Sequence, residues 1–251
     1  MIHFVGAGPG APDLISVRGA RLLAEADIII YAGSLVNPDV LQHRKKECVV
    51  YDSAYMTLEQ VIEVMQQAHA EKKELVRLHT GDQSLYGAIR EQMDELIRLG
   101  IPYDDVPGIS SFCGAAAALQ TEYTLPGVSQ SVIITRMEGR TPVPDREKLR
   151  EMAKHGCSMV IFLSMGLIRE VAQELLQGAY TEETPAAIVY KATWPEEKVF
   201  YCTVGTLAET AEREGIRKTA LIVVGDFLNA SYDRSKLYDP GFTTEFRQAE
   251  G

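Results

Sequence analysis

The sequence predicts an α/β fold built as two α/β domains. Short runs of β-branched and apolar residues alternate with longer segments of helical periodicity, and this alternation occurs in two series. With 251 residues, 46% of them hydrophobic, the chain can bury one large core or two smaller ones. We expect residues 1–119 to form the first domain and 120–251 the second. A ligand is expected between them, because clefts at domain junctions are common binding sites.

In the first series, the ends of the helices carry clear signals. Ser16 is a candidate N-cap, Thr57 and Gln60 form a candidate capping box, and Gly100 follows a last helical turn. Strands are expected at residues 2–5, 27–31, 75–78 and 103–106, and helices at 17–26, 58–71 and 85–99.

The second series follows a small-residue helix expected at 114–119 and a linker at 122–130, which contains Pro126 and Gly127. Strands are expected at residues 131–135, 159–163, 186–190, 199–203 and 220–224, and helices at 145–155, 166–176 and 206–214. The polar tail after Asn229 is expected to be loosely held.

Charge and composition argue against several functions. The formal net charge of −10 disfavours nucleic-acid binding, which depends mostly on Lys and Arg that neutralise phosphates. The apolar runs last about five residues, far short of the ~20 that a membrane span needs. Four widely spaced cysteines, with no CxxC pair and no metal-ligand spacing, indicate reduced thiols and no metal site. With no secretory leader visible, we expect a cytoplasmic protein.

Three loops rich in small residues follow three of the expected strands. Residues 6–10 (Gly-Ala-Gly-Pro-Gly) let the backbone turn sharply and approach a ligand closely. Residues 79–87 combine glycines with one acid, Asp82, and residues 106–111 read Val-Pro-Gly-Ile-Ser-Ser. In one sheet these loops would line a common edge, with room for a flat, mostly neutral ligand such as a nucleoside.

Simpler interpretations of these loops stay open. The first loop could be a dinucleotide site or only a structural turn, although its spacing is GxGxG rather than GxGxxG and Pro9 removes an amide that could hold phosphate. In the second loop, Asp82 could merely cap a helix that begins at Leu85.

The second half offers weaker candidates. Met165 alone would be core packing more often than a ligand contact. Arg136, Arg140 and Lys191 would usually be solvated on an acidic chain. If they face the cleft, their charges can hold the carboxylates of a substrate.

Taken together, these loops resemble the tetrapyrrole (class III) methyltransferases over nearly the whole chain. The similarity is strongest to members that methylate C-11 of precorrin-4 or cobalt-precorrin-4 in cobalamin (vitamin B12) biosynthesis, and it lies in residues 31–36, 52–54, 124–130, 138–144 and 191–195. The resemblance implies the tetrapyrrole methylase fold, a homodimer, S-adenosyl-L-methionine in the cleft, and a trough in the first domain for a tetrapyrrole substrate.

The resemblance also implies which residues bind the cofactor: Pro9, Thr80, Gly81, Asp82, Leu85, Ser110, Ser111, Met165, Ala192 and Ala220. We assign no general base, because an electrophilic methyl group and an electron-rich pyrrole carbon need mainly alignment. Three positions depart from the family pattern. Gln83 replaces a proline, Thr80 replaces a glycine, and Tyr55 stands where a glycine is expected.

Two other classes of function stay open. The same cofactor could serve another acceptor, such as a different precorrin position, uroporphyrinogen III, an rRNA base or a modified protein histidine, although the acidic charge disfavours RNA. Alternatively, the chain could be a nucleotide-binding regulatory or scaffold protein that has lost its chemistry.

Overall fold

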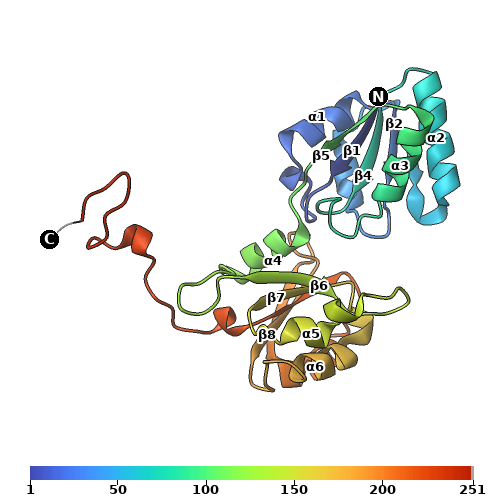
Figure 1. Ribbon diagram of the computed structural model, residues 1–251. Coiled ribbons are helices and arrows are strands. Elements are labelled where there is room, and N and C mark those ends of the chain that lie inside the picture. The colour runs from blue at the N-terminus through green and yellow to red at the C-terminus, as the bar shows by residue number, and fades with distance from the viewer. Residues whose placement is uncertain (250–251) are drawn as a thin grey trace. The chain divides into compact units, whose positions relative to one another are not determined.

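A computed structural model describes residues 1–249 and divides the chain into two units. Unit 1 comprises Met1–Ala115 and Lys191–Glu197, and unit 2 comprises Ala116–Tyr190 and the chain from Lys198 onward. Each unit contains one five-stranded sheet with helices (Figure 1), which confirms the predicted α/β class. The functional roles expected for residues 1–119 and 120–251 stay a prediction.

Unit 1 contains an all-parallel sheet covered by helices on both faces. Its order is β3-β2-β4-β1-β5. The elements are β1 (Ile2–Gly6), α1 (Val17–Glu25), β2 (Ile28–Tyr31), β3 (Val49–Asp52), α2 (Leu58–Ala70), β4 (Leu75–His79), α3 (Arg90–Leu99) and β5 (Tyr103–Val106). Leu23 of α1 packs on one face, while Met65 of α2 and Leu96 of α3 pack on the other (Figure 1). Because all strands run parallel, their carboxyl ends share one edge.

The predicted helix ends of unit 1 are confirmed, with one exception. Ser16 Oγ accepts from Gly19 N at 3.0 Å, the capping box at α2 has both its bonds, and Gly100 ends α3 with φ +67°. The start expected at Leu85 is wrong, since α3 begins at Arg90. Tyr86 and Ala88 have φ values of 57° and 49°, a left-handed conformation that a helix cannot include. Strand β3 was not expected.

Unit 2 contains a mixed sheet. Its order is β6-β7-β10-β8-β9, and β10 runs antiparallel to both its neighbours. The elements are β6 (Val132–Arg136), α5 (Leu149–Ala153), β7 (Ser158–Phe162), α6 (Ile168–Leu176), β8 (Pro185–Tyr190), β9 (Lys198–Thr203), α7 (Leu207–Arg213) and β10 (Ala220–Val224). Helix α4 (Ser111–Leu119) contains the boundary between the units. Buried side chains of α5, α6 and α7 form one core with Ile161, Ile188 and Ile222 of the sheet.

The strands predicted in this half agree with the observed ones to within one residue. The helix expected at 145–155 is instead a 3-10 turn, Asp145–Glu147, followed by α5. Lys148 separates the two, because its φ of −55° and ψ of 144° are not helical.

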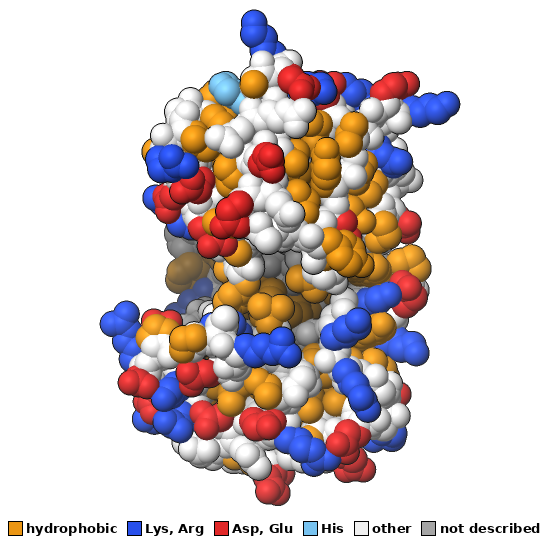
Figure 2. Space-filling model, turned by 90° about the vertical axis from the view of Figure 1, so that its right-hand side faces the viewer, with side chains coloured by type: hydrophobic (Ala, Val, Ile, Leu, Met, Phe, Trp, Pro, Cys, Tyr) orange, Lys and Arg blue, Asp and Glu red, His pale blue; other side chains and the backbone are white. Residues whose placement is uncertain are grey.

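On the face that Figure 2 shows, charged side chains of both signs lie among hydrophobic ones. All four cysteines are free thiols. Within residues 1–249, no helix is both long enough and apolar enough to cross a membrane.

Candidate functional site

The loops that follow β1, β4 and β5 meet backbone to backbone in unit 1. Gly8 and Gly81 exchange two hydrogen bonds, of 3.2 and 2.8 Å. A Cβ atom on Gly6 would lie 2.6 Å from the Cα of Gly108, and one on Gly108 would lie 2.7 Å from the Cα of Gly6. Two of these loops therefore need glycine to pack this closely. The predicted common edge is confirmed, since β4, β1 and β5 are neighbours in the sheet.

Asp82 joins two of these loops through its carboxylate. Its Oδ2 accepts from the amide of Gly108 at 2.8 Å, and its Oδ1 accepts from the amide and the hydroxyl of Ser84. Burial alone would raise the pKa of Asp82, but these hydrogen bonds outweigh burial and lower it below its usual value. The carboxylate is thus ionised at neutral pH. The alternative that Asp82 caps a helix is wrong, because α3 begins eight residues later, at Arg90.

Gln83 makes a second connection to the same neighbouring loop. Its side chain is buried, and its Nε2 donates to the carbonyl of Val106 at 2.9 Å and to Asp105 Oδ1. A proline here would leave only the Asp82 connection. This role of Gln83 is not evident from the sequence, where glutamine reads as an ordinary polar loop residue.

A segment distant in sequence packs on the first loop. The indole of Trp194 donates to the carbonyl of Pro9 at 3.2 Å, and Thr193 Oγ1 accepts from Ala11 N at 3.0 Å. The carbonyl of Ala192 lies against the same loop, 2.9 Å from where a Cβ of Gly10 would be. Ala192 and Pro9 are both predicted cofactor residues, from loops about 180 residues apart in the sequence. The structure therefore brings them close together.

Two titratable groups, His79 and Asp82, lie at the end of β4 and in the loop after it. His79 ends β4 and is almost fully buried, and its Nε2 has no hydrogen-bond partner in the described chain. Burial, reinforced by the charge of Arg77, lowers the pKa of His79 to about 3. His79 is therefore neutral at physiological pH. The Asp82 carboxylate leaves a negative charge beside it.

These features disfavour the dinucleotide interpretation of the first loop. The amide of Ala7 donates to the His79 carbonyl at 2.7 Å, that of Gly8 to Gly81, and that of Ala11 to Thr193, while Pro9 has no amide hydrogen. Few donors remain to cradle a phosphate. Small neutral residues beside one carboxylate instead suit a nucleoside that carries a positive sulfonium group, such as S-adenosylmethionine.

Eight of the ten predicted cofactor residues lie in the described part of unit 1, on these loops and on the segment that packs against them: Pro9, Thr80, Gly81, Asp82, Leu85, Ser110, Ser111 and Ala192. Met165 and Ala220 belong to unit 2. There they share one edge of the sheet, because Met165 follows the end of β7 and Ala220 pairs with Tyr190 at the end of β8. That each of the ten contacts the cofactor stays a prediction.

The three basic candidates differ in how far their charges are already used. Arg136 donates to the carbonyls of Met137, Thr141 and Pro142, so its guanidinium organises its own loop. Lys191 pairs with Glu196 at 3.0 Å and lies 4.7 Å from the centre of the Trp194 ring. Arg140 is exposed.

Backbone strain is concentrated in the loops already described. Of the eight non-glycine residues with positive φ in the described chain, six lie in the loops that follow β4, β7 or β8 or that precede β10: Tyr86, Ala88, Leu163, Lys191, Thr193 and Thr219. Such conformations cost of order 1–3 kcal/mol each and cluster at functional sites in known proteins. The strain therefore marks the same loops as the sequence motifs.

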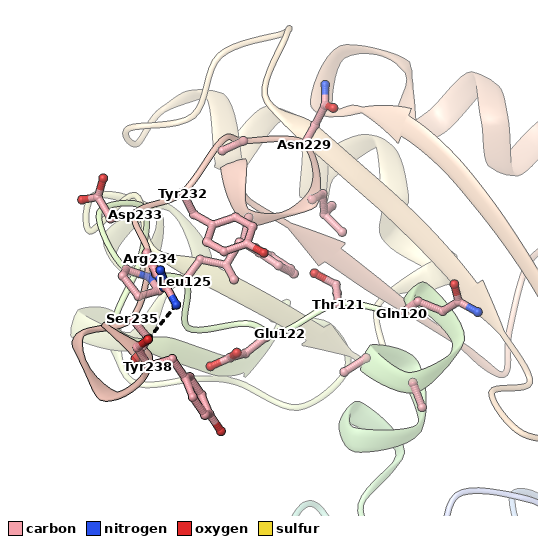
Figure 3. A pocket seen from close by; sticks show the side chains of 16 residues that line it. Gln120, Thr121, Glu122, Leu125, Asn229, Tyr232, Asp233, Arg234, Ser235 and Tyr238 are labelled. Carbon is pink, nitrogen blue, oxygen red and sulfur yellow. Dashed lines mark hydrogen bonds between the residues drawn. The ribbon is translucent and has the colours of Figure 1, made fainter. Parts of the chain in front are cut away.

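Unit 2 also has a pocket of about 660 Å³, which contains none of the predicted residues. It lies between the segment around Glu122 and the chain around Tyr232 (Figure 3). Arg234 donates to the carbonyl of Tyr238 at 2.7 Å and so fixes the tail at its rim. Over residues 1–249, no three or more His, Cys, Asp and Glu side chains are grouped to hold a metal ion.

Comparisons with known proteins decide the family. The model of the tetrapyrrole (corrin/porphyrin) methylases matches residues 1–208. The chain belongs to this family. A relative from Methanocaldococcus jannaschii, named cobalt-precorrin-4 C(11)-methyltransferase, is 54% identical over 249 residues, which cover 99% of this chain and 96% of the relative.

Two solved structures of the tetrapyrrole methylases are also similar. An X-ray structure of a cobalamin biosynthetic enzyme, cobalt precorrin-4 methyltransferase, aligns with a TM-score of 0.89 and 46% identity, covering 91% of this chain and 96% of the other. Uroporphyrin-III C-methyltransferase from Thermus thermophilus, in complex with S-adenosyl homocysteine, aligns with a TM-score of 0.75 and 26% identity, covering 91% and 93%. The tetrapyrrole methylase fold predicted from the sequence is confirmed.

Proposed function

We propose that this methylase transfers a methyl group from S-adenosyl-L-methionine to C-11 of precorrin-4 or cobalt-precorrin-4 in cobalamin biosynthesis. The observation that carries the proposal is the 54% identity, over almost the full chain, to a relative with that name. The structure named for uroporphyrin III is less similar, at 26% identity. Methylation of uroporphyrinogen III is therefore the second candidate.

The loops of unit 1 support this choice of cofactor. The ionised Asp82 supplies a negative charge that attracts a sulfonium, and the neutral His79 adds no repulsion. Pro9, Ser110 and Ala192 contribute small surfaces against which an adenosine can pack. Bound S-adenosylmethionine would supply an already electrophilic methyl group.

In this reaction the protein acts mainly by positioning the cofactor and the acceptor. Holding two reactants in line can contribute on the order of 7 to 11 kcal/mol, so no general base is required. Asp82 does this indirectly, since it holds Gly108 and thereby sets the shape of the third loop. Arg140, Arg136 and Lys191 are our weaker candidates for holding the acceptor's carboxylates. We also expect the protein to be cytoplasmic and to form a homodimer. Light scattering of the purified protein would measure its molecular mass and so test the dimer.

The decisive experiment locates the transferred methyl group. The protein is incubated with isotopically labelled S-adenosylmethionine and precorrin-4, with and without cobalt, and the product is analysed by NMR. We expect the label at C-11. Label at another carbon, or transfer only to uroporphyrinogen III, would overturn the assignment of the acceptor.

A titration separates the cofactor from the acceptor. We expect S-adenosylmethionine to bind with a Kd near or below ~100 μM, which corresponds to roughly 5 to 6 kcal/mol of binding free energy. Absence of binding at ~1 mM would overturn the enzyme assignment itself.

A further inference from the structure

The carboxyl edge of the unit 1 sheet has two halves of different character. The loops after β4, β1 and β5 are closely packed and lined by small residues, as described above. The loops after β2 and β3 form the other half, which carries Tyr31, Asp52 and Tyr55. The side chain of Asn37 joins the halves, since its Nδ2 donates to the carbonyl of Gly10 at 2.9 Å.

Tyr55 is held rigidly on this second half but is hardly buried. It ends the 3-10 turn Ser53–Tyr55. Asp52 Oδ1 accepts from Ala54 N at 2.9 Å and from Gly33 N at 3.0 Å, and the Ser53 hydroxyl donates to the carbonyl of Tyr31 at 3.1 Å. The Tyr55 side chain is nevertheless 88% exposed. The fold therefore fixes the backbone of Tyr55 without using its ring.

The surroundings of Tyr55 suit a flat, conjugated ligand. Tyr31 is half-buried nearby; burial, then the charge of Asp52 and the phenol of Tyr55, raise its pKa, so it stays neutral at physiological pH. Two tyrosine rings offer aromatic surface with little rotamer entropy to lose. The Asp52 carboxylate repels the acidic side chains of a tetrapyrrole. This half of the edge therefore fits the face of a macrocycle rather than its carboxylate rim.

We propose that Tyr55 contacts the face of the tetrapyrrole acceptor and contributes to its binding. This inference depends on the proposed function, because it takes the acceptor to be a tetrapyrrole. It assigns the small-residue half of the edge to the cofactor and the tyrosine half to the acceptor.

The test compares Tyr55→Ala and Tyr55→Phe with wild type. We expect Tyr55→Ala to raise the KM for the precorrin acceptor about tenfold, since a lost aromatic contact weakens binding. Tyr55→Phe keeps the ring and should stay within about twofold of wild type. The Kd of S-adenosylmethionine and the unfolding midpoint should not change, because the ring packs against little of the protein. Phe246→Ala is the matched control, since Phe246 is 96% exposed at the other end of the chain.

Binding of a stable porphyrin keeps this test independent of turnover. Uroporphyrin III is titrated into each variant without S-adenosylmethionine, and its absorbance is followed. If wild type binds the porphyrin but methylates no precorrin, the proposed function fails while the weakened binding of Tyr55→Ala still supports this inference. Equal tetrapyrrole affinity of wild type and Tyr55→Ala overturns it. The inference is also overturned if Tyr55→Ala has a lower unfolding midpoint, binds the cofactor more weakly or no longer forms a dimer that wild type forms. Failure of wild type to bind any tetrapyrrole overturns it as well.

Discussion

The sheet of unit 1 runs parallel throughout, whereas in unit 2 strand β10 runs against both its neighbours. The candidate loops formed by the unit 1 sheet therefore all follow a strand, at the edge where the carboxyl ends of the strands lie. In unit 2, one edge of the sheet receives Met165 from the end of β7 but Ala220 from the beginning of β10. Where neighbouring strands are antiparallel, a small residue that begins one strand can thus lie at the same edge of the sheet as a residue that follows the other.

Close to the strand ends, the two sheets also use different residues in left-handed conformations. In unit 1, Gly8 and Gly81 have φ values of 82° and 60°, which glycine adopts at no steric cost. In unit 2, Leu163 and Thr219 have φ values of 53° and 57° at equivalent places beside strand ends. The comparison indicates that glycine supplies the left-handed turns where the unit 1 loops meet backbone to backbone, whereas Leu163 and Thr219 supply them directly beside the strands of unit 2.

The largest effect is expected where backbones meet. Gly108→Ala would place a Cβ 2.7 Å from the Cα of Gly6 and still closer to the carbonyl of Gly81, and neither can move without bending a strand end. We expect the free energy of unfolding to fall by about 3 kcal/mol and S-adenosylmethionine binding to weaken at least ~100-fold. Urea unfolding and calorimetric titration measure the two quantities.

The loop after β7 in unit 2 supplies the matched control. A Cβ on Gly166 has no atom within 4 Å, so Gly166→Ala should change the unfolding free energy by no more than about 0.5 kcal/mol. Similar losses of stability in both variants would show that the edges do not differ in packing.

An intermediate effect is expected at the carboxylate that joins two loops of unit 1. Asp82→Ala leaves the amides of Gly108 and Ser84 without an acceptor, so we expect a loss of about 1–3 kcal/mol in unfolding free energy. S-adenosylmethionine binding should weaken about tenfold or more, because the third loop loses its anchor and the site loses a negative charge. Titration of the purified variant measures the Kd.

Asp52→Ala separates cofactor binding from stability. Asp52 also accepts from two backbone amides, those of Gly33 and Ala54, but it lies on the tyrosine half of the edge. We expect a comparable loss of stability with unchanged affinity for S-adenosylmethionine. Equal weakening of cofactor binding in the two variants would contradict the division of the edge into two halves.

The sequence predicted the buried strands and the capped helix ends because both depend on local patterns. Ser16, the Thr57 and Gln60 pair and Gly100 each act within one helical turn. The cofactor positions were predicted from the resemblance, and eight of them lie in unit 1: seven on loops after its strands, and Ala192 on the segment that packs against the first loop. Local signals thus sufficed for most of the parallel unit.

Other features depend on contacts that local patterns do not carry. Strand β3 is a partly exposed edge strand, so it lacks the continuous apolar run that marks β1 or β4. The late start of α3 depends on the conformations of Tyr86 and Ala88, which side-chain type does not predict. The packing of Trp194 on the loop at Pro9 joins residues 185 positions apart. These features depend on long-range contacts or on backbone conformation, which local sequence patterns do not reveal.

The smallest effect is expected from relieving strain at the unit 2 edge. Leu163 is 61% exposed and left-handed, so Leu163→Gly loses little packing and removes a conformational cost of about 1–2 kcal/mol. Because glycine also gains entropy in the unfolded chain, we expect the unfolding free energy to stay equal or rise by up to about 1 kcal/mol. Leu35, at 37% exposure in the loop after β2, has no positive φ, so Leu35→Gly should instead destabilise unit 1 by roughly 1 kcal/mol. Urea unfolding of both variants measures the sign. If Leu163→Gly destabilises as much as Leu35→Gly, the left-handed leucine carries no strain, and the difference between the two edges reduces to strand direction alone.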